Sequence, residues 1–261
     1  MNISDYYEIA GDGPPIVFIH GSFATTSAWK GIIKEISTNH TCILIKLPGH
    51  GGAPDPDDFS DPTIETELEI LESVVKSLTT KPVHLVGHSF GGVVALAQAL
   101  KGNLQLSQLS LFEPVAIWLL DKVKNFEARA IVDEFLFEYR QAVLQKQPSA
   151  CGKVIDFWGG KGNFELLPEK VKESMEMLVD NNIRHWNTEA AIKSTLAELE
   201  SCSIPTQLVC GTKSNSVAIS ICDHLNEVLP NSRKYVIPGA SHFLVTSHAH
   251  QCVEVLQDSN G

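Results

Sequence analysis

Short runs of consecutive apolar residues alternate along the chain with longer segments whose apolar residues recur every three or four positions. The short runs are typical of strands buried on both faces of a parallel sheet, and the longer segments are typical of amphipathic helices. Strands are predicted at residues 6–10, 16–19, 42–47, 83–86, 106–112, 206–210 and 234–237, and helices at 25–37, 63–78, 93–100, 217–229 and 245–256. This alternation predicts an α/β fold with a mostly parallel central sheet flanked by helices.

The alternation stops between residues 116 and 200, where helical patterns at 126–145, 167–181 and 188–199 follow one another without a strand. Because this block begins where a strand ends, we expect it to lie over the carboxyl edge of the sheet as a cap. We therefore predict a core of residues 1–115 and 201–261 with a helical cap of residues 116–200. We expect some cap aromatics to line an apolar pocket and more to pack in the core: Phe126, Phe135, Phe137, Tyr139, Phe157, Trp158 and Trp186.

Composition narrows the choice of partners. The 261 residues carry a formal net charge of −11, whereas a protein that binds nucleic acid needs a basic face. The first residues lack a basic start followed by an apolar stretch, and no segment approaches the ~20 apolar residues of a membrane span. We expect a cytoplasmic protein without a nucleic-acid or membrane partner. The six cysteines lack CxxC spacing, which favours buried reduced thiols over disulfides or a zinc site.

One candidate for chemistry is the serine in Gly87-His88-Ser89-Phe90-Gly91, a GxSxG sequence between a predicted strand and a helix of small residues. A sharp turn from strand to helix strains the backbone at the serine and holds its oxygen above the sheet edge. Glycines two positions to either side let the strand and the helix pass closely. We therefore predict that Ser89 is a nucleophile.

A serine nucleophile needs a base, and the base needs an acid that orients it. The chain has ten histidines. His242 follows the last predicted strand, which places it at the same sheet edge as Ser89, so we predict that His242 is the base. We interpret His88, inside the turn, as a packing residue, and His185 has no motif around it.

An acyl-transfer site also needs two backbone N–H groups that face the developing negative charge. We predict that one belongs to Phe90, which directly follows the nucleophile and begins a helix. The second is expected in the loop after the strand at residues 16–19. We choose Ser22, with Phe23 as the next choice, because His20-Gly21 turns this loop inward.

No metal or cofactor is predicted. A site built from His242, His248 and His250 lacks both HExxH spacing and acidic ligands.

The order of four motifs resembles the α/β-hydrolase fold family: His20-Gly21, Pro48-Gly49-His50-Gly51, the GxSxG turn, and Pro238-Gly239-Ala240-Ser241-His242. The resemblance implies a mostly parallel sheet, a helical cap, and a triad in the chain order serine, acid, histidine. By it, Ser89 is the nucleophile and His242 the base. It favours the carboxylesterase-like branch over epoxide hydrolases and haloalkane dehalogenases, which need an aspartate in place of the serine.

The acid departs from the common pattern of this family. Most members carry an aspartate in the loop after the penultimate strand, but residues 211–216 contain no carboxylate. A minority place the acid after the preceding strand, where this chain has Glu113. We predict that Glu113 reaches His242. Two alternatives stay open, namely a structural Glu113 bonded to the cap backbone and a neutral Asn215 as the orienting group.

These residues favour a serine hydrolase that cleaves a small, partly apolar ester through an acyl-enzyme. Hydrolysis of a C–C bond, a thioester or a lactone, or a cofactor-free lyase reaction, uses the same triad on the same fold. A ligand-binding protein with slow turnover is the alternative outside enzymes.

Overall fold

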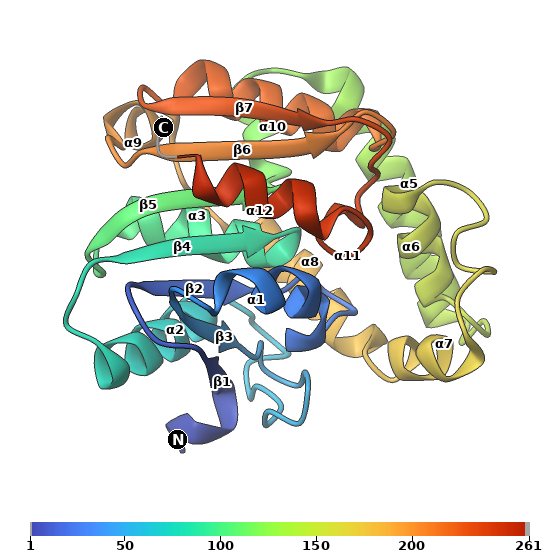
Figure 1. The fold of residues 1–261 in the computed structure, drawn as a ribbon. Helices are drawn as coiled ribbons and strands as arrows, with labels where there is room; N and C mark the ends of the chain where they lie inside the picture. Colours follow the sequence, from blue (N-terminus) through green and yellow to red (C-terminus); the bar gives the residue numbers. More distant parts are fainter. Residues whose placement is uncertain (1, 259–261) are drawn as a thin grey trace.

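The computed structural model describes residues 2–258 and is built around one seven-stranded sheet (Figure 1). The strand order is β1-β3-β2-β4-β5-β6-β7, with β1 antiparallel to β3 and all other neighbours parallel. The strands are β1 (Tyr7–Ala10), β2 (Pro15–Ile19), β3 (Thr41–Ile45), β4 (Val83–His88), β5 (Leu106–Phe112), β6 (Thr206–Gly211) and β7 (Ser232–Ile237). The predicted α/β fold with a mostly parallel sheet is confirmed.

Helices cover both faces of this sheet (Figure 1). One face carries η2 (Thr26–Trp29), α1 (Lys30–Ile36), α11 (Leu244–Ser247) and α12 (Ala249–Gln257), and the other carries α2 (Glu65–Leu78), α3 (Phe90–Lys101) and α10 (Ser216–Val228). A short helix, η1 (Ile3–Tyr6), precedes β1. Successive side chains of a strand point to opposite faces, so Val17 enters one hydrophobic core and Phe18 the other. This explains why the central strands are apolar at consecutive positions.

Between β5 and β6 the chain forms helices that we call the inserted helices. They are α4 (Trp118–Lys122), α5 (Phe126–Leu144), α6 (Cys151–Gly159), α7 (Glu169–Glu176), α8 (Val179–Ala191) and α9 (Leu196–Ser201). Of these, α5, α6 and α7 lie beyond the arrowheads of β6 and β7 in Figure 1, at the carboxyl edge of the sheet. In residues 2–258, no helix is both long enough and apolar enough to cross a membrane.

The predicted boundaries of the last two helical patterns in this insert were wrong. The predicted gap at residues 182–187 is the middle of α8, and the helix is instead interrupted at residues 192–195. The apolar pattern failed there because the buried face of α8 is largely polar. It carries Asn181, Asn182, Arg184, His185, Thr188 and Glu189.

The aromatic and cysteine predictions had different outcomes. All six cysteines are free and buried, as predicted. Phe126 and Phe137 of α5 are each 67% exposed, so these two aromatics neither pack in the core nor line a pocket. Trp158 and Trp186 are buried beside the site described below.

Candidate active site

The candidate residues meet because each follows the end of a neighbouring strand. Ser89 directly follows β4, Glu113 directly follows β5, and His242 lies in the loop after β7. The register pairs His88 of β4 with Phe112 of β5, so the next residues, Ser89 and Glu113, extend from adjacent strands. All of these strands are parallel, and their carboxyl ends form one edge of the sheet.

Ser89 lies in the sharp turn that its glycines predict. Its backbone has φ 55° and ψ −123°, a conformation that is uncommon for a residue with a side chain. A Cβ added to Gly87 would lie 2.3 Å from the carbonyl oxygen of Gly91, and one added to Gly91 would lie 2.3 Å from that of Ile19. Only glycine fits at either position, because the start of α3 lies at backbone contact with both β4 and the end of β2.

Glu113 lies at the position from which it reaches His242. Its Oε2 is 2.8 Å from His242 Nδ1, and its side chain is fully buried. Its Oε1 accepts hydrogen bonds from Gly211 N–H, at 3.0 Å, and from the hydroxyl of Ser214. Burial alone would raise the pKa of Glu113, but the hydrogen bonds and charge of His242, with those two donors, hold the pKa below its ordinary value. The carboxylate therefore stays ionised at neutral pH.

The contacts of Glu113 and Asn215 do not fit the two alternatives, in which Glu113 bonds to the cap backbone or Asn215 orients the histidine. The donors to Glu113 Oε1 are the last residue of β6 and Ser214 of the loop after it, which belong to the sheet edge and not to the inserted helices. Asn215 is engaged elsewhere, since its Oδ1 accepts from Val217 N–H at the start of α10 and its Nδ2 donates to the carbonyl of Phe157. Gly211 and Ser214, at the end of β6 and in the loop after it, thus donate to the carboxylate that follows β5.

The loop after β2 holds the two candidates for the second oxyanion donor. His20 donates Nδ1–H to Gly21 O at 2.8 Å and accepts Leu47 N–H on Nε2 at 3.3 Å, which ties this loop to the end of β3. Ser22 and Phe23 follow and border the same cavity as Ser89. Phe23 has a positive φ of 42°. Phe90, the other predicted donor, is the first residue of α3, where backbone N–H groups lack helical acceptors.

A cavity of about 250 Å³ opens beside Ser89, His242, Ser22 and Phe90. Much of its wall is apolar and comes from Val154, Ile155, Trp158, Leu167, Met175, Trp186, Phe243 and Val245. Among the described residues that line it, none is a lysine or an arginine. Glu189 lies in the wall and accepts Trp118 N–H at 2.8 Å. Burial raises the pKa of Glu189 to about 8, so this carboxyl is largely neutral at pH 7.

Sequence reasoning missed the roles of two histidines. His88 is more than a packing residue, because its Nε2–H donates to the backbone carbonyl of His242 at 2.8 Å and so fixes the loop that carries the candidate base. His185 lines the cavity and shares a hydrogen bond of 2.7 Å with Ser22 Oγ. The helical spacing of Asn182, His185 and Glu189 was the signal available for α8. In the described part of the chain, no group of three or more potential ligands could hold a metal ion.

A serine turn after a central strand, with a histidine and a carboxylate at the same sheet edge, is the arrangement found in α/β hydrolases. A profile of the Alpha/beta hydrolase family matches residues 16–255, and the chain belongs to this family.

Curated relatives align over nearly the whole chain. The pimeloyl-[acyl-carrier protein] methyl ester esterase of Aeromonas hydrophila is 26% identical over 275 residues, which cover 95% of this chain and 95% of that protein. The human monoacylglycerol lipase ABHD6 is 22% identical over 95% of this chain and 75% of its own length. Among solved structures, a lipase-esterase related protein from Clostridium acetobutylicum has a TM-score of 0.74 at 20% identity, covering 96% of this chain and 97% of that one. This structural likeness supports the fold.

The buried histidines predict a stability that falls in mild acid. Burial lowers the pKa of five of them, three of them to about 3: His20, His84 and His88, with His50 and His185 also lowered. A lowered pKa in the folded state means that the unfolded chain binds more protons below pH 6.5. Stability is therefore full above this pH and declines as the pH falls, by up to about 1.4 kcal/mol per pH unit for each histidine. The raised pKa values of Glu67 and Glu189 have the opposite effect, because they make the folded state more stable as the pH falls. These are two carboxyl groups, whereas five histidines have lowered pKa values.

Thermal unfolding between pH 7.5 and 5 measures this effect. We expect Tm to fall steadily below pH 6.5, and to fall less steeply in His84→Gln, which removes one of the titrating groups. A Tm that is level from pH 7 to 5 would contradict the assignment of these histidines as neutral.

Proposed function

We propose that this protein is a carboxylic ester hydrolase that cleaves small, uncharged and partly apolar esters through an acyl-enzyme on Ser89. The observation that carries this proposal is the 2.8 Å hydrogen bond between Glu113 Oε2 and His242 Nδ1, at a cavity that Ser89 also lines. The ionised Glu113 holds Nδ1 in its protonated form, so that Nε2 is left as the basic nitrogen of His242.

The first half of the proposed reaction forms the acyl-enzyme. Ser89 Oγ attacks the ester carbonyl while His242 Nε2 takes its proton, and Glu113 stabilises the imidazolium that results. The carbonyl oxygen becomes an oxyanion, which accepts hydrogen bonds from the backbone N–H groups of Phe90 and Ser22. The partial positive charge at the start of α3 adds to this stabilisation. When the tetrahedral intermediate collapses, His242 returns the proton to the departing alcohol.

In the second half, water attacks the acyl carbonyl and gives a proton to His242 Nε2. The same N–H groups hold the second oxyanion. Collapse releases the carboxylic acid and returns the proton to Ser89 Oγ, which restores the starting enzyme.

The cavity supports an uncharged substrate. An anionic substrate would have to leave water for an apolar wall without a lysine or arginine to pair with, and burial of an unpaired charge is costly. The names of the two relatives, a methyl ester esterase and a monoacylglycerol lipase, support hydrolysis of an ester. We further propose that residues 116–200 act as a cap over a core of residues 1–115 and 201–261, because their side chains form much of the cavity wall.

Labelling with a fluorophosphonate tests the nucleophile. We expect the protein to be labelled, and Ser89→Ala to lose both labelling and ester turnover because no other group forms the acyl-enzyme. Ser107, which is exposed in β5 and does not line the cavity, provides the matched control. Ser107→Ala should be labelled as the wild type is. Turnover that survives in Ser89→Ala would reject the mechanism, and a native protein that is not labelled would favour a binding role.

A panel of substrates tests which type of bond is cleaved and whether the substrate is uncharged. We expect p-nitrophenyl and methyl esters of short and medium acyl chains to be hydrolysed with kcat/KM at least about tenfold above that of esters that carry a free carboxylate, which is the effect of about 1.4 kcal/mol. A thioester, a lactone and a diketone are measured alongside. Faster turnover of any of these three, or of the charged esters, would reject the assigned substrate class.

Glu113→Gln tests the acid. A glutamine side chain cannot stabilise the imidazolium, and it favours the tautomer in which Nε2 carries the proton, so we expect kcat to fall by about 10³-fold or more. Asn215→Ala is the comparison, since Asn215 caps α10; it should lose about 1 kcal/mol of stability with kcat unchanged. Near wild-type turnover in Glu113→Gln would remove this residue from the mechanism.

A further inference from the structure

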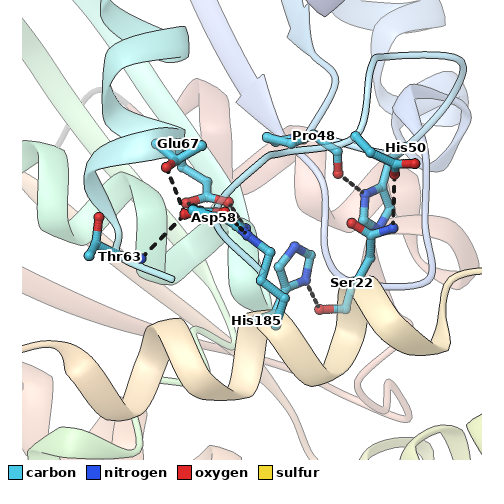
Figure 2. Close-up of polar contacts among 11 residues, drawn as sticks. Ser22, Pro48, His50, Asp58, Thr63, Glu67 and His185 are labelled. Atoms are coloured by element: carbon cyan, nitrogen blue, oxygen red, sulfur yellow. Dashed lines mark hydrogen bonds and ion pairs between the residues drawn. The ribbon is translucent and has the colours of Figure 1, made fainter. Parts of the chain in front are cut away.

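His185 contacts both residues to which we assign the oxyanion donors. Its Nδ1 shares a 2.7 Å hydrogen bond with Ser22 Oγ, which Figure 2 shows with the two side chains pointing toward each other. Its ring stacks on Phe90, with 3.9 Å between the ring centroids and 11° between the planes. One side chain of α8 therefore reaches across the cavity edge to the loop after β2 and to the start of α3.

The imidazole also stacks on His50, at 5.3 Å between centroids and 12° between planes. His50 is itself fixed, because its Nδ1–H donates to Pro48 O at 2.8 Å. The ring of His185 thus stacks on both Phe90 and His50. Burial lowers its pKa well below the usual value, which keeps it neutral. A buried neutral ring with two stacked neighbours has little freedom to rotate away from Ser22.

The neighbouring residue anchors α8 to the core. Arg184 is fully buried and donates to Asp58 at 2.5 and 2.7 Å and to Glu67 at 2.5 Å. Figure 2 shows these two carboxylates above the helix that carries His185. Arg184 and His185 are adjacent, so the ion pairs that hold α8 on the core also constrain the position of the imidazole relative to Ser22.

We propose that His185 is a positioning residue for the oxyanion hole. It holds Ser22 and Phe90 in place for the oxyanion only when α8 is packed on the core. This role rests on the proposed function, because it assumes that the N–H groups of Ser22 and Phe90 bind the oxyanion. His185 acts through its hydrogen bond to the side chain of Ser22, which orients the backbone of that loop, and through its stack on Phe90. The inserted helices then contribute to transition-state binding as well as to the cavity wall.

Kinetics of two single variants and their combination test the proposal. His185→Phe keeps an aromatic ring that can stack on Phe90 and His50 but loses the hydrogen bond to Ser22. Ser22→Ala loses the same bond without a change in α8. For p-nitrophenyl butyrate, we expect each to lower kcat about tenfold with KM changed less than about twofold. The double variant should be no slower than the slower single, because both remove one interaction.

Affinity for an alkyl boronic acid, which forms a tetrahedral adduct with a serine, provides a readout that a packing role would not affect. We expect it to weaken by the same factor as kcat/KM in both single variants. His185→Gln, which can restore a donor or acceptor to Ser22, should recover part of kcat. His250→Phe is the matched control, because His250 is exposed on α12, and it should behave as the wild type does.

The outcomes separate this proposal from the function on which it rests. If the wild type lacks turnover that depends on Ser89, both are rejected. If the wild type turns over but His185→Phe and Ser22→Ala keep its kcat, or if their losses multiply in the double variant, only the positioning role is overturned. Should His185→Phe fail to fold, Ser22→Ala decides by itself, because it removes the same hydrogen bond at a partly exposed position.

Discussion

Close backbone contact between β4 and α3 is the constraint on which the candidate site depends. With Gly87 and Gly91 at the crossing, the chain reverses direction over very few residues, and Ser89 is forced to a positive φ. Residues held in such conformations cost of order 1–3 kcal/mol each and persist only where the surroundings determine them. Phe23 and Glu113 also have positive φ, and each lies just beyond a neighbouring strand end. In the described chain, six residues other than glycine have a positive φ. Three of them lie at the edge where we place the chemistry, and the other three, Lys124, Lys146 and Ser149, belong to the insert.

The position of the carboxylate illustrates that, in a parallel sheet, a carboxylate can follow one strand or its neighbour and still reach the same histidine. The loop after β6 lacks an acid, yet this strand end is still involved, because Gly211 N–H at the end of β6 and the Ser214 hydroxyl of the loop donate to Glu113 of the neighbouring strand end. The longer glutamate side chain bridges from β5 to the loop after β7. In this arrangement two strand ends share one task, with one of them supplying the carboxylate and the other the donors that keep it ionised.

Polar residues inside the insert connect it to the sheet edge. Most helices that cover a core present an apolar face, but the buried face of α8 carries an arginine, a histidine and a glutamate. Arg184 pairs with Asp58 and Glu67, and His185 with Ser22, all of them in the core. Glu189 accepts Trp118 N–H within the insert. Buried polar groups are costly unless they are hydrogen-bonded, so such contacts specify one docking of α8 more narrowly than apolar packing would.

The sequence by itself determined the sheet, the serine turn and the histidine after the last strand, because these depend on local patterns: apolar runs, glycine spacing and strand ends. It also pointed to Glu113 as the acid, since residues 211–216 contain no carboxylate, but it left a structural Glu113 and a neutral Asn215 as alternatives. Only the tertiary structure decided what depends on contacts between distant segments. The partners of Glu113 lie 98 to 129 residues away, and those of His185 are more than ninety residues away. The limits of α8 were missed for the same physical reason, because its buried polar residues resemble an exposed face until their partners are seen.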